Sequence, residues 1–161
     1  RGDIAPFVIS GPGEYEVSGI FIKGFLSKNS EGKLNTIYKV TMEGMNLCFL
    51  GCFGESALPT EAKEATEDVD IIFVPIGDNG ALDAHSAEKI ANQFEPKVII
   101  PAHFAWGTEA GEGAKSGQNN SLKTFLKEAG AEDVKPVEKF TVKRKDIEGM
   151  EGEVVVLSMA V

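Results

Sequence analysis

Histidine is scarce in this chain of 161 residues, in which only His85 and His103 occur. The sequence contains no His-x-His-x-Asp-His cluster, so it lacks most of the imidazole ligands that a metal site built on that motif would use. His103 follows Pro101 and Ala102, directly after the apolar run 97–100. A parallel strand at that run would deliver His103 to the edge of a sheet where ligand sites lie. His103 is therefore the first candidate site residue.

Basic residues and long apolar runs are also few. The 16 Lys and Arg are outnumbered by 25 Asp and Glu, which gives a net charge of -9 and a pI near 4.8. This charge argues against a nucleic-acid partner, because binding phosphates requires clustered cations. The one basic run, 143–145, is followed by Asp146 and Glu148, and we interpret it as a solvated strand end. No run approaches the roughly 18–20 apolar residues of a membrane span, so we expect no membrane partner.

The two cysteines, Cys48 and Cys52, lie in or beside one extended segment. Four positions of extended chain separate them by roughly 13 Å, so a disulfide would need a tight bend. We interpret both as buried free thiols in a reducing compartment, which predicts a cytoplasmic protein. The chain opens at Arg1 without an initiator methionine and soon reaches the strand-like residues 6–9, so we expect it to be a piece of a longer chain.

The first third of the chain has the pattern of antiparallel strands. Short runs rich in β-branched and aromatic residues alternate with glycine-containing or polar connections, as in consecutive hairpins. The Gly-Pro-Gly composition of residues 11–13 demands a turn or a close approach of two backbones. The expected elements are strands 7–10, 17–23, 36–42 and 45–50, turns at 11–14 and 43–44, and a polar loop at 27–33.

The rest of the chain alternates helices and strands. Residues 69–103 are predicted to form a β-loop-α-β unit, with Asp83 as the helix N-cap and two parallel strands connected in the right-handed sense. Residues 107–118 lack periodicity and exceed a plain connection in length, which predicts a flap. The other expected elements are a helix at 59–65, a helix capped by Asn120 or Ser121 and stopped at Gly130, and strands 140–143 and 154–158. Together these patterns predict one α+β domain spanning residues 1–161.

Four motifs in sequence order carry a resemblance to a known family. They are Gly11-Pro12-Gly13-Glu14-Tyr15-Glu16-Val17, Leu50-Gly51-Cys52, Val74-Pro75-Ile76-Gly77, and the segment 95–103, which ends in Pro101-Ala102-His103. In this order the sequence resembles the metallo-β-lactamase-fold hydrolase superfamily, and within it a branch of predicted zinc-dependent hydrolases. The resemblance implies an αββα sandwich, here N-terminally incomplete, whose family holds one or two metal ions at the sheet edges with five motifs.

The family's site residues carry over only where this sequence matches its motifs. His103 matches the final metal-binding histidine, which follows a proline and one further residue at a strand end. Cys52 falls where the family's Leu-Gly-Asp places the aspartate that bridges the metals. Lys28 or Asn29 falls near the position of a further expected histidine. The His-x-His-x-Asp-His motif of the family would precede Arg1. The resemblance thus leaves His103 and Cys52 as the metal-ligand candidates, and the same two residues as catalytic candidates.

Three functions follow from this reduced set of ligands. Because catalytic zinc takes about three protein ligands and an open position for water, the first hypothesis is a degenerate, non-catalytic binding or structural module without a cofactor, which could hold a small molecule. The second is a metal-dependent hydrolase, present here as a fragment, in which zinc activates a water against a small ester, amide or phosphodiester. The third is metal-free thiol chemistry by Cys52 with His103 as base.

A sandwich without its first strands would expose an apolar sheet face and an unpaired edge. A second copy could cover them, so we expect a homo-oligomer, most simply a C2 dimer. Among the remaining polar residues, His85 in the first turn of its helix is expected to face solvent. Glu14 and Glu16, two apart in a strand, share one face and could act as an acid/base pair, although surface charge explains them as well. Asp78 and Asn79 are interpreted as a turn.

Overall fold

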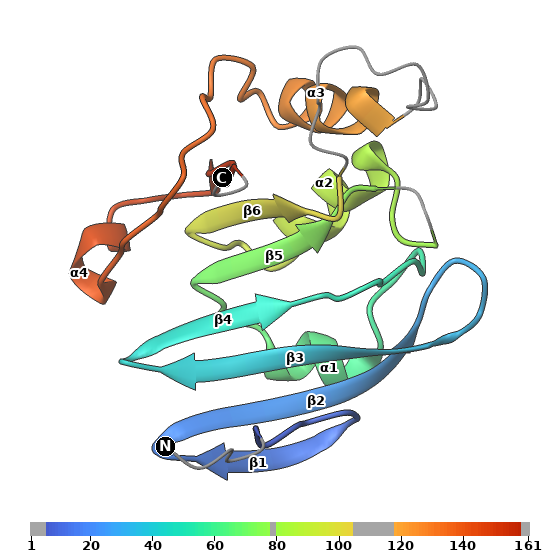
Figure 1. Cartoon of the computed structure of the whole chain (residues 1–161), viewed down its shortest axis with the longest axis vertical. Helices are drawn as coiled ribbons and strands as arrows, with labels where there is room; N and C mark the ends of the chain where they lie inside the picture. The colour runs from blue at the N-terminus through green and yellow to red at the C-terminus, as the bar shows by residue number, and fades with distance from the viewer. Residues whose placement is uncertain (1–5, 78–79, 105–117, 159–161) are drawn as a thin grey trace.

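The computed structural model describes residues 6–77, 80–104 and 118–158 and confirms the α+β class (Figure 1). None of the helices in these ranges is long and apolar enough to cross a membrane. The elements in chain order are β1 (Gly13–Val17), β2 (Ile20–Lys28), β3 (Leu34–Met42), β4 (Met45–Phe49), α1 (Thr60–Ala65), β5 (Ile71–Pro75), α2 (Ala84–Asn92), β6 (Val98–Ala102), α3 (Gln118–Glu128), α4 (Arg144–Ile147) and β7 (Glu153–Val154).

The strands form one mixed sheet in which their spatial order equals their order along the chain. β1 to β4 pair antiparallel as consecutive hairpins, whereas β4, β5, β6 and β7 pair in parallel. The change of direction follows from the connections, because a parallel pair needs a crossover and the chain supplies α1 before β5 and α2 before β6. The predicted β-loop-α-β unit is therefore confirmed. Its N-cap is also confirmed, since Asp83 accepts hydrogen bonds from the backbone N–H groups of His85 and Ser86.

One face of the sheet carries the main core. Side chains from β2 to β6 that point to this face pack with α1, α2 and α3, and we call it the helix face; its fully buried members include Ile37, Cys48, Ile72 and Phe125. The opposite face has a smaller core, in which Ile147 of α4 packs with residues at the β4–β6 end of the sheet. Figure 1 shows α4 set apart from the other helices. The four helices therefore cover the two faces unequally.

The structure corrects several local predictions, among them strand 154–158, of which only Val154 belongs to a strand, β7. Residues 7–10 form no strand, and the first hairpin turns instead at Ser18 and Gly19, which both have positive φ, 53° and 79°. Residues 140–143 also form no strand, because Lys143 is the N-cap of α4 and the basic run begins a helix. Helix α3 starts at Gln118, ahead of the predicted caps. Its predicted stop is confirmed, since Gly130 has a φ of 63° just beyond the helix.

Candidate functional site

The structure brings Cys52 and His103 together at one edge of the sheet. Cys52 follows β4 and His103 follows β6, and β5 lies between these two parallel strands. Because parallel strands all end at the same edge, both residues emerge there. The Sγ atom of Cys52 lies 3.8 Å from Nδ1 of His103, and both residues are exposed. The two candidates from the sequence therefore form one thiol–imidazole pair.

The turn that carries Cys52 is held by the side chain of Asn35 on β3. The Oδ1 atom of Asn35 accepts a hydrogen bond from the Cys52 N–H at 2.9 Å, and its Nδ2 donates to the carbonyl of Leu50 at 2.9 Å. Gly51 between them has a φ of 62°, and a Cβ there would lie 2.6 Å from Asn35 Oδ1. Sequence reasoning missed Asn35. A signal was present, since asparagine is unusual in the interior of a strand.

His103 is held in a strained backbone conformation. Its φ is 57°, in the left-handed region that non-glycine residues rarely adopt. The residue before it is anchored, because the Ala102 carbonyl accepts a hydrogen bond from Ile76 N–H at 2.9 Å. Gly77 then passes so close that a Cβ on it would lie 1.8 Å from the His103 carbonyl oxygen. The surrounding backbone thus fixes the direction in which His103 leaves the sheet.

The geometry of the pair fits two ligands of one zinc ion. With a Zn–S bond of about 2.3 Å, a Zn–N bond of about 2.05 Å and a tetrahedral angle, sulfur and nitrogen would lie about 3.6 Å apart. The observed separation is 3.8 Å. Among the residues that the structure describes, however, no group of three or more His, Cys, Asp or Glu side chains is placed to hold a metal ion. The described residues therefore fit a partial donor set and not a complete zinc site.

The two thiols differ sharply in environment, and neither forms a disulfide. Cys48 is fully buried on the helix face, and burial raises the pKa of its thiol to about 12, against a smaller opposing effect of the Lys39 charge. Cys52 is exposed, so the prediction of a buried thiol is confirmed for Cys48 and wrong for Cys52. The reason is that Cys52 lies beyond the end of β4, in the turn. Only the exposed thiol is available for chemistry.

Other predicted positions have partners of their own where the structure describes them. Asn29 is used by its own loop, since its Oδ1 accepts hydrogen bonds from the N–H groups of Glu31 and Lys33. His85 is exposed as expected, with its Nδ1 3.2 Å from the Glu128 carboxylate. Asp78 and Asn79, as well as the predicted flap up to residue 117, fall outside the described residues.

The predicted pair of acidic residues on β1 does share one exposed face. Glu14 forms an ion pair with Lys23 at 2.8 Å, and the hydrogen bond from Lys23 together with its charge lowers the pKa of the Glu14 carboxyl. A carboxylate paired with a lysine is a poor proton acceptor, so we assign no acid/base role to Glu14.

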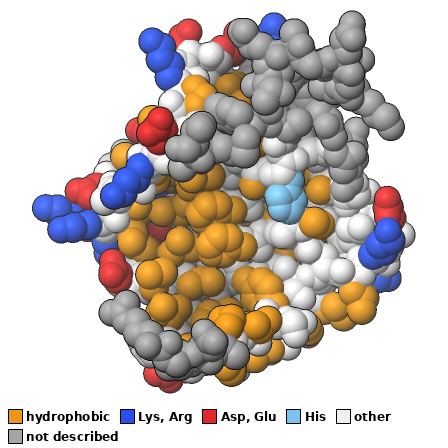
Figure 2. Space-filling model, viewed as in Figure 1, with side chains coloured by type: hydrophobic (Ala, Val, Ile, Leu, Met, Phe, Trp, Pro, Cys, Tyr) orange, Lys and Arg blue, Asp and Glu red, His pale blue; other side chains and the backbone are white. Residues whose placement is uncertain are grey.

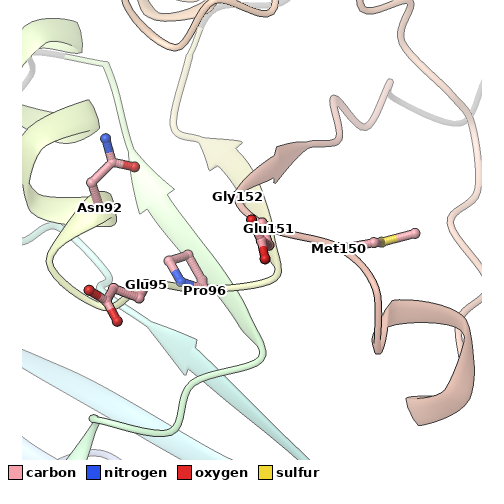
Figure 3. A pocket seen from close by; sticks show the side chains of 6 residues that line it. All are labelled: Asn92, Glu95, Pro96, Met150, Glu151 and Gly152. Carbon is pink, nitrogen blue, oxygen red and sulfur yellow. The ribbon is translucent and has the colours of Figure 1, made fainter.

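A cavity of about 490 Å³ lies at the other end of the parallel strands (Figure 3). It is bordered by the end of α2 and by the turns that precede β6 and β7; its lining residues are Asn92, Glu95, Pro96, Met150, Glu151 and Gly152. Figure 3 shows the Glu95 and Met150 side chains pointing away from each other. Because these lining side chains do not point toward a common centre, the cavity is a weaker candidate than the Cys52–His103 pair.

Comparison with known proteins shows which family and which solved structures this chain is similar to. A family model described as a beta-lactamase superfamily domain matches residues 3–103. A predicted zinc-dependent hydrolase of the metallo-β-lactamase superfamily from Thermotoga maritima has 28% identity and a TM-score of 0.70, covering 96% of this chain and 73% of that chain. Igni18, a metallo hydrolase from Ignicoccus hospitalis, has 15% identity and a TM-score of 0.57, and the match covers 96% of this chain and 58% of that chain. The metallo-β-lactamase fold protein YhfI from Bacillus subtilis has 11% identity and a TM-score of 0.57, and the match covers 96% of this chain and 54% of that chain. These similarities confirm the expected fold.

Proposed function

Because the chain belongs to the beta-lactamase superfamily, we propose that it is a hydrolase-fold domain that serves as a binding or structural module without metal-dependent catalysis. The observation that carries this proposal is the composition of the site at the sheet edge. That site offers one thiol and one imidazole within 3.8 Å of each other, and the described residues add no third ligand.

The chemistry of these donors supports the proposal. A catalytic zinc site needs about three protein ligands to outcompete water and leave one position open. Zinc binds cysteine as thiolate and histidine as neutral imidazole, so this edge offers one ligand of each kind. Two exposed donors without a third hold zinc weakly. The Cys52–His103 pair then marks the exposed edge of the sheet at which such a module would bind a small molecule.

Metal analysis of the purified chain tests this proposal. After dialysis against metal-free buffer, we expect zinc and manganese well below one ion per chain by mass spectrometry. The variant His103→Ala should not change that content, and neither should His85→Ala, which removes the other exposed histidine as a matched control. One ion per chain that is lost in His103→Ala and kept in His85→Ala would overturn the proposal.

A metal-dependent hydrolase is the second candidate, and one observation favours it. The 3.8 Å between Cys52 Sγ and His103 Nδ1 is close to the separation of about 3.6 Å between two ligands of one zinc ion. The Thermotoga maritima protein, 28% identical, is itself a predicted zinc-dependent hydrolase. In this candidate Cys52 and His103 would be two ligands, and further ligands would come from outside the described residues. The ion would supply Lewis acidity and an activated water for hydrolysis.

Activity with simple substrates separates the two candidates. The chain is assayed with p-nitrophenyl acetate and bis-p-nitrophenyl phosphate, with and without added zinc or manganese. The hydrolase requires metal-dependent turnover that both Cys52→Ala and His103→Ala abolish and His85→Ala leaves intact. Turnover at the rate of buffer with metal alone, for a chain that is folded by circular dichroism, would refute it.

A further inference from the structure

Strand β1 forms one edge of the sheet (Figure 1). Among the strands that the structure describes it pairs with β2 alone, in a hairpin whose two-residue turn, 18–19, has positive φ at both positions. In such hairpins the residues that flank the turn, here Val17 and Ile20, exchange hydrogen bonds, and hydrogen-bonded pairs alternate from there along the strands. The backbone N–H and C=O groups of Glu14 and Glu16 therefore point away from β2. An edge of this kind is a template for a further extended strand.

A groove lies beside this edge on the helix face, between the strands β1 to β3 and the helix α1. Two hollows of about 540 Å³ and about 400 Å³ form it, and they share Glu14, Lys23 and Ala65 as lining residues. Because α1 has only 6 residues, it leaves part of these strands uncovered. Phe21 lines the groove and is 54% exposed. Its ring offers an apolar contact to a segment that lies along β1.

Charged side chains of β1 to β3 line this groove, whereas on the opposite face of the sheet Figure 2 shows hydrophobic side chains gathered over the strands. Both lysines of the groove already have acidic partners. Lys23 pairs with Glu14 at 2.8 Å. Lys39 donates to the Ala65 carbonyl at 3.0 Å and pairs with Asp68. Three further carboxylates on β1 and α1 take part in none of the ion pairs among the described residues, and these are Glu16, Glu61 and Glu64. The surface therefore carries an excess of negative charge.

We propose that the edge of β1 and the groove beside it form a docking surface for a basic peptide segment of another protein, which adds to the sheet as an extended strand. Main-chain hydrogen bonds to Glu14 and Glu16 would hold such a strand, and every second side chain would point toward the groove. This surface shares no residue with the Cys52–His103 pair, so the inference does not depend on the function proposed above.

The charges decide which occupant fits this edge. A second copy of β1 would place Glu14 and Glu16 of the two chains opposite each other, and like charges directly opposite are destabilising. A strand with Lys or Arg at every second position instead sets a cation opposite each of these glutamates. The carboxylates on α1 add to the attraction across the groove. An arginine on this face also reaches a ring it can stack on, that of Phe21.

Fluorescence polarisation with a short labelled peptide in which Arg and Val alternate tests the proposal. We expect saturable binding with a dissociation constant below about 1 mM. Two control peptides should fail to bind. One has Glu in place of Arg, which reverses the charge. The other has methylated backbone nitrogens, so it keeps every positive charge but cannot donate hydrogen bonds to the edge of β1.

Two variants of Glu16 separate the roles of charge and backbone. Glu16→Lys reverses an exposed charge and should weaken binding of the Arg-Val peptide at least about fivefold. Glu16→Pro removes an outward N–H, which an edge strand tolerates, and should abolish binding. The matched control is Glu132→Lys, which makes the same change of net charge at an exposed residue just beyond α3, at the other end of the molecule from β1 in Figure 1. It should leave the affinity within about twofold.

Circular dichroism checks the fold of each variant, and if Glu16→Pro fails to fold, Glu16→Lys and the methylated peptide decide. No saturation up to about 1 mM would overturn the proposal. Equal binding of the methylated peptide would also overturn it, because attraction of charge alone would then explain the affinity. The same holds if Glu132→Lys weakens binding as much as Glu16→Lys does. Light scattering on the chain alone completes the test, since a dimer that Glu16→Pro dissociates would assign this edge to a second copy instead.

Discussion

The tight passage of Gly77 beside His103 allows a quantitative prediction for Gly77→Ala. The new Cβ would lie 1.8 Å from the His103 carbonyl oxygen, whereas real Cβ contacts essentially never fall below 3.0 Å, so the two backbones must separate by at least 1.2 Å. Overpacking typically costs about 1–3 kcal/mol. A backbone carbonyl cannot rotate away as a side chain can, so we expect the upper end of this range, about 3 kcal/mol.

Thermal unfolding followed by circular dichroism measures this effect. For a chain of this size, about 3 kcal/mol lowers Tm by roughly 6–12 °C. Gly149→Ala is the matched control, because a Cβ at Gly149 has no atom within 4 Å and the residue does not have a positive φ. It should change the free energy of unfolding by less than about 0.5 kcal/mol. A Tm for Gly77→Ala within a degree or two of the control would refute the close packing of Gly77 on His103.

Three further predictions concern single side chains. Asn35→Ala removes the hydrogen bonds that hold the Cys52 turn and should lower the free energy of unfolding in urea by about 2 kcal/mol. Iodoacetamide should label the native chain once, at Cys52, and the denatured chain twice, since burial raises the pKa of Cys48 to about 12; a second native adduct seen by mass spectrometry would contradict this. Burial raises the pKa of Asp70, but the hydrogen bond and charge of Lys97 are among the effects that outweigh it and leave the pKa lowered. This carboxylate therefore stabilises the fold above about pH 4 and loses that effect as the pH falls through its lowered pKa, so Asp70→Asn should flatten the acid limb of stability in urea titrations at stepped pH.

Local patterns predicted the parallel half of the fold well. The strand-loop-helix-strand unit was readable because proline, glycine and the Asp83 cap stop and start its elements within a few residues. The first hairpin was harder to predict. Residues 7–10 have strand composition yet form no strand, and the sheet instead begins at Gly13. Composition cannot reveal which of two neighbouring apolar segments finds a partner strand, because that choice depends on contacts distant in sequence.

The candidate site, like the fold, was predictable from the sequence only in part. The motifs around Cys52 and His103 indicated two residues at strand ends, but their 3.8 Å separation follows from β4 and β6 flanking β5 in the sheet. The role of Asn35 was not foreseen, because its partners lie 15 and 17 residues away along the chain. The exposure of Cys52 was predicted wrongly, because the sequence does not show that its strand ends at Phe49.

The sequence by itself determined the class of the fold, the family and the two residues of the candidate site, because periodicity, turn residues and motif order are local properties of the chain. Only the tertiary structure decided that these two residues meet, that the Gly77 backbone restrains one of them, and that the main core lies on the helix face of the sheet. These features depend on which strands pair and which sheet face each helix covers. Such choices are made by packing between distant segments, which no local pattern specifies.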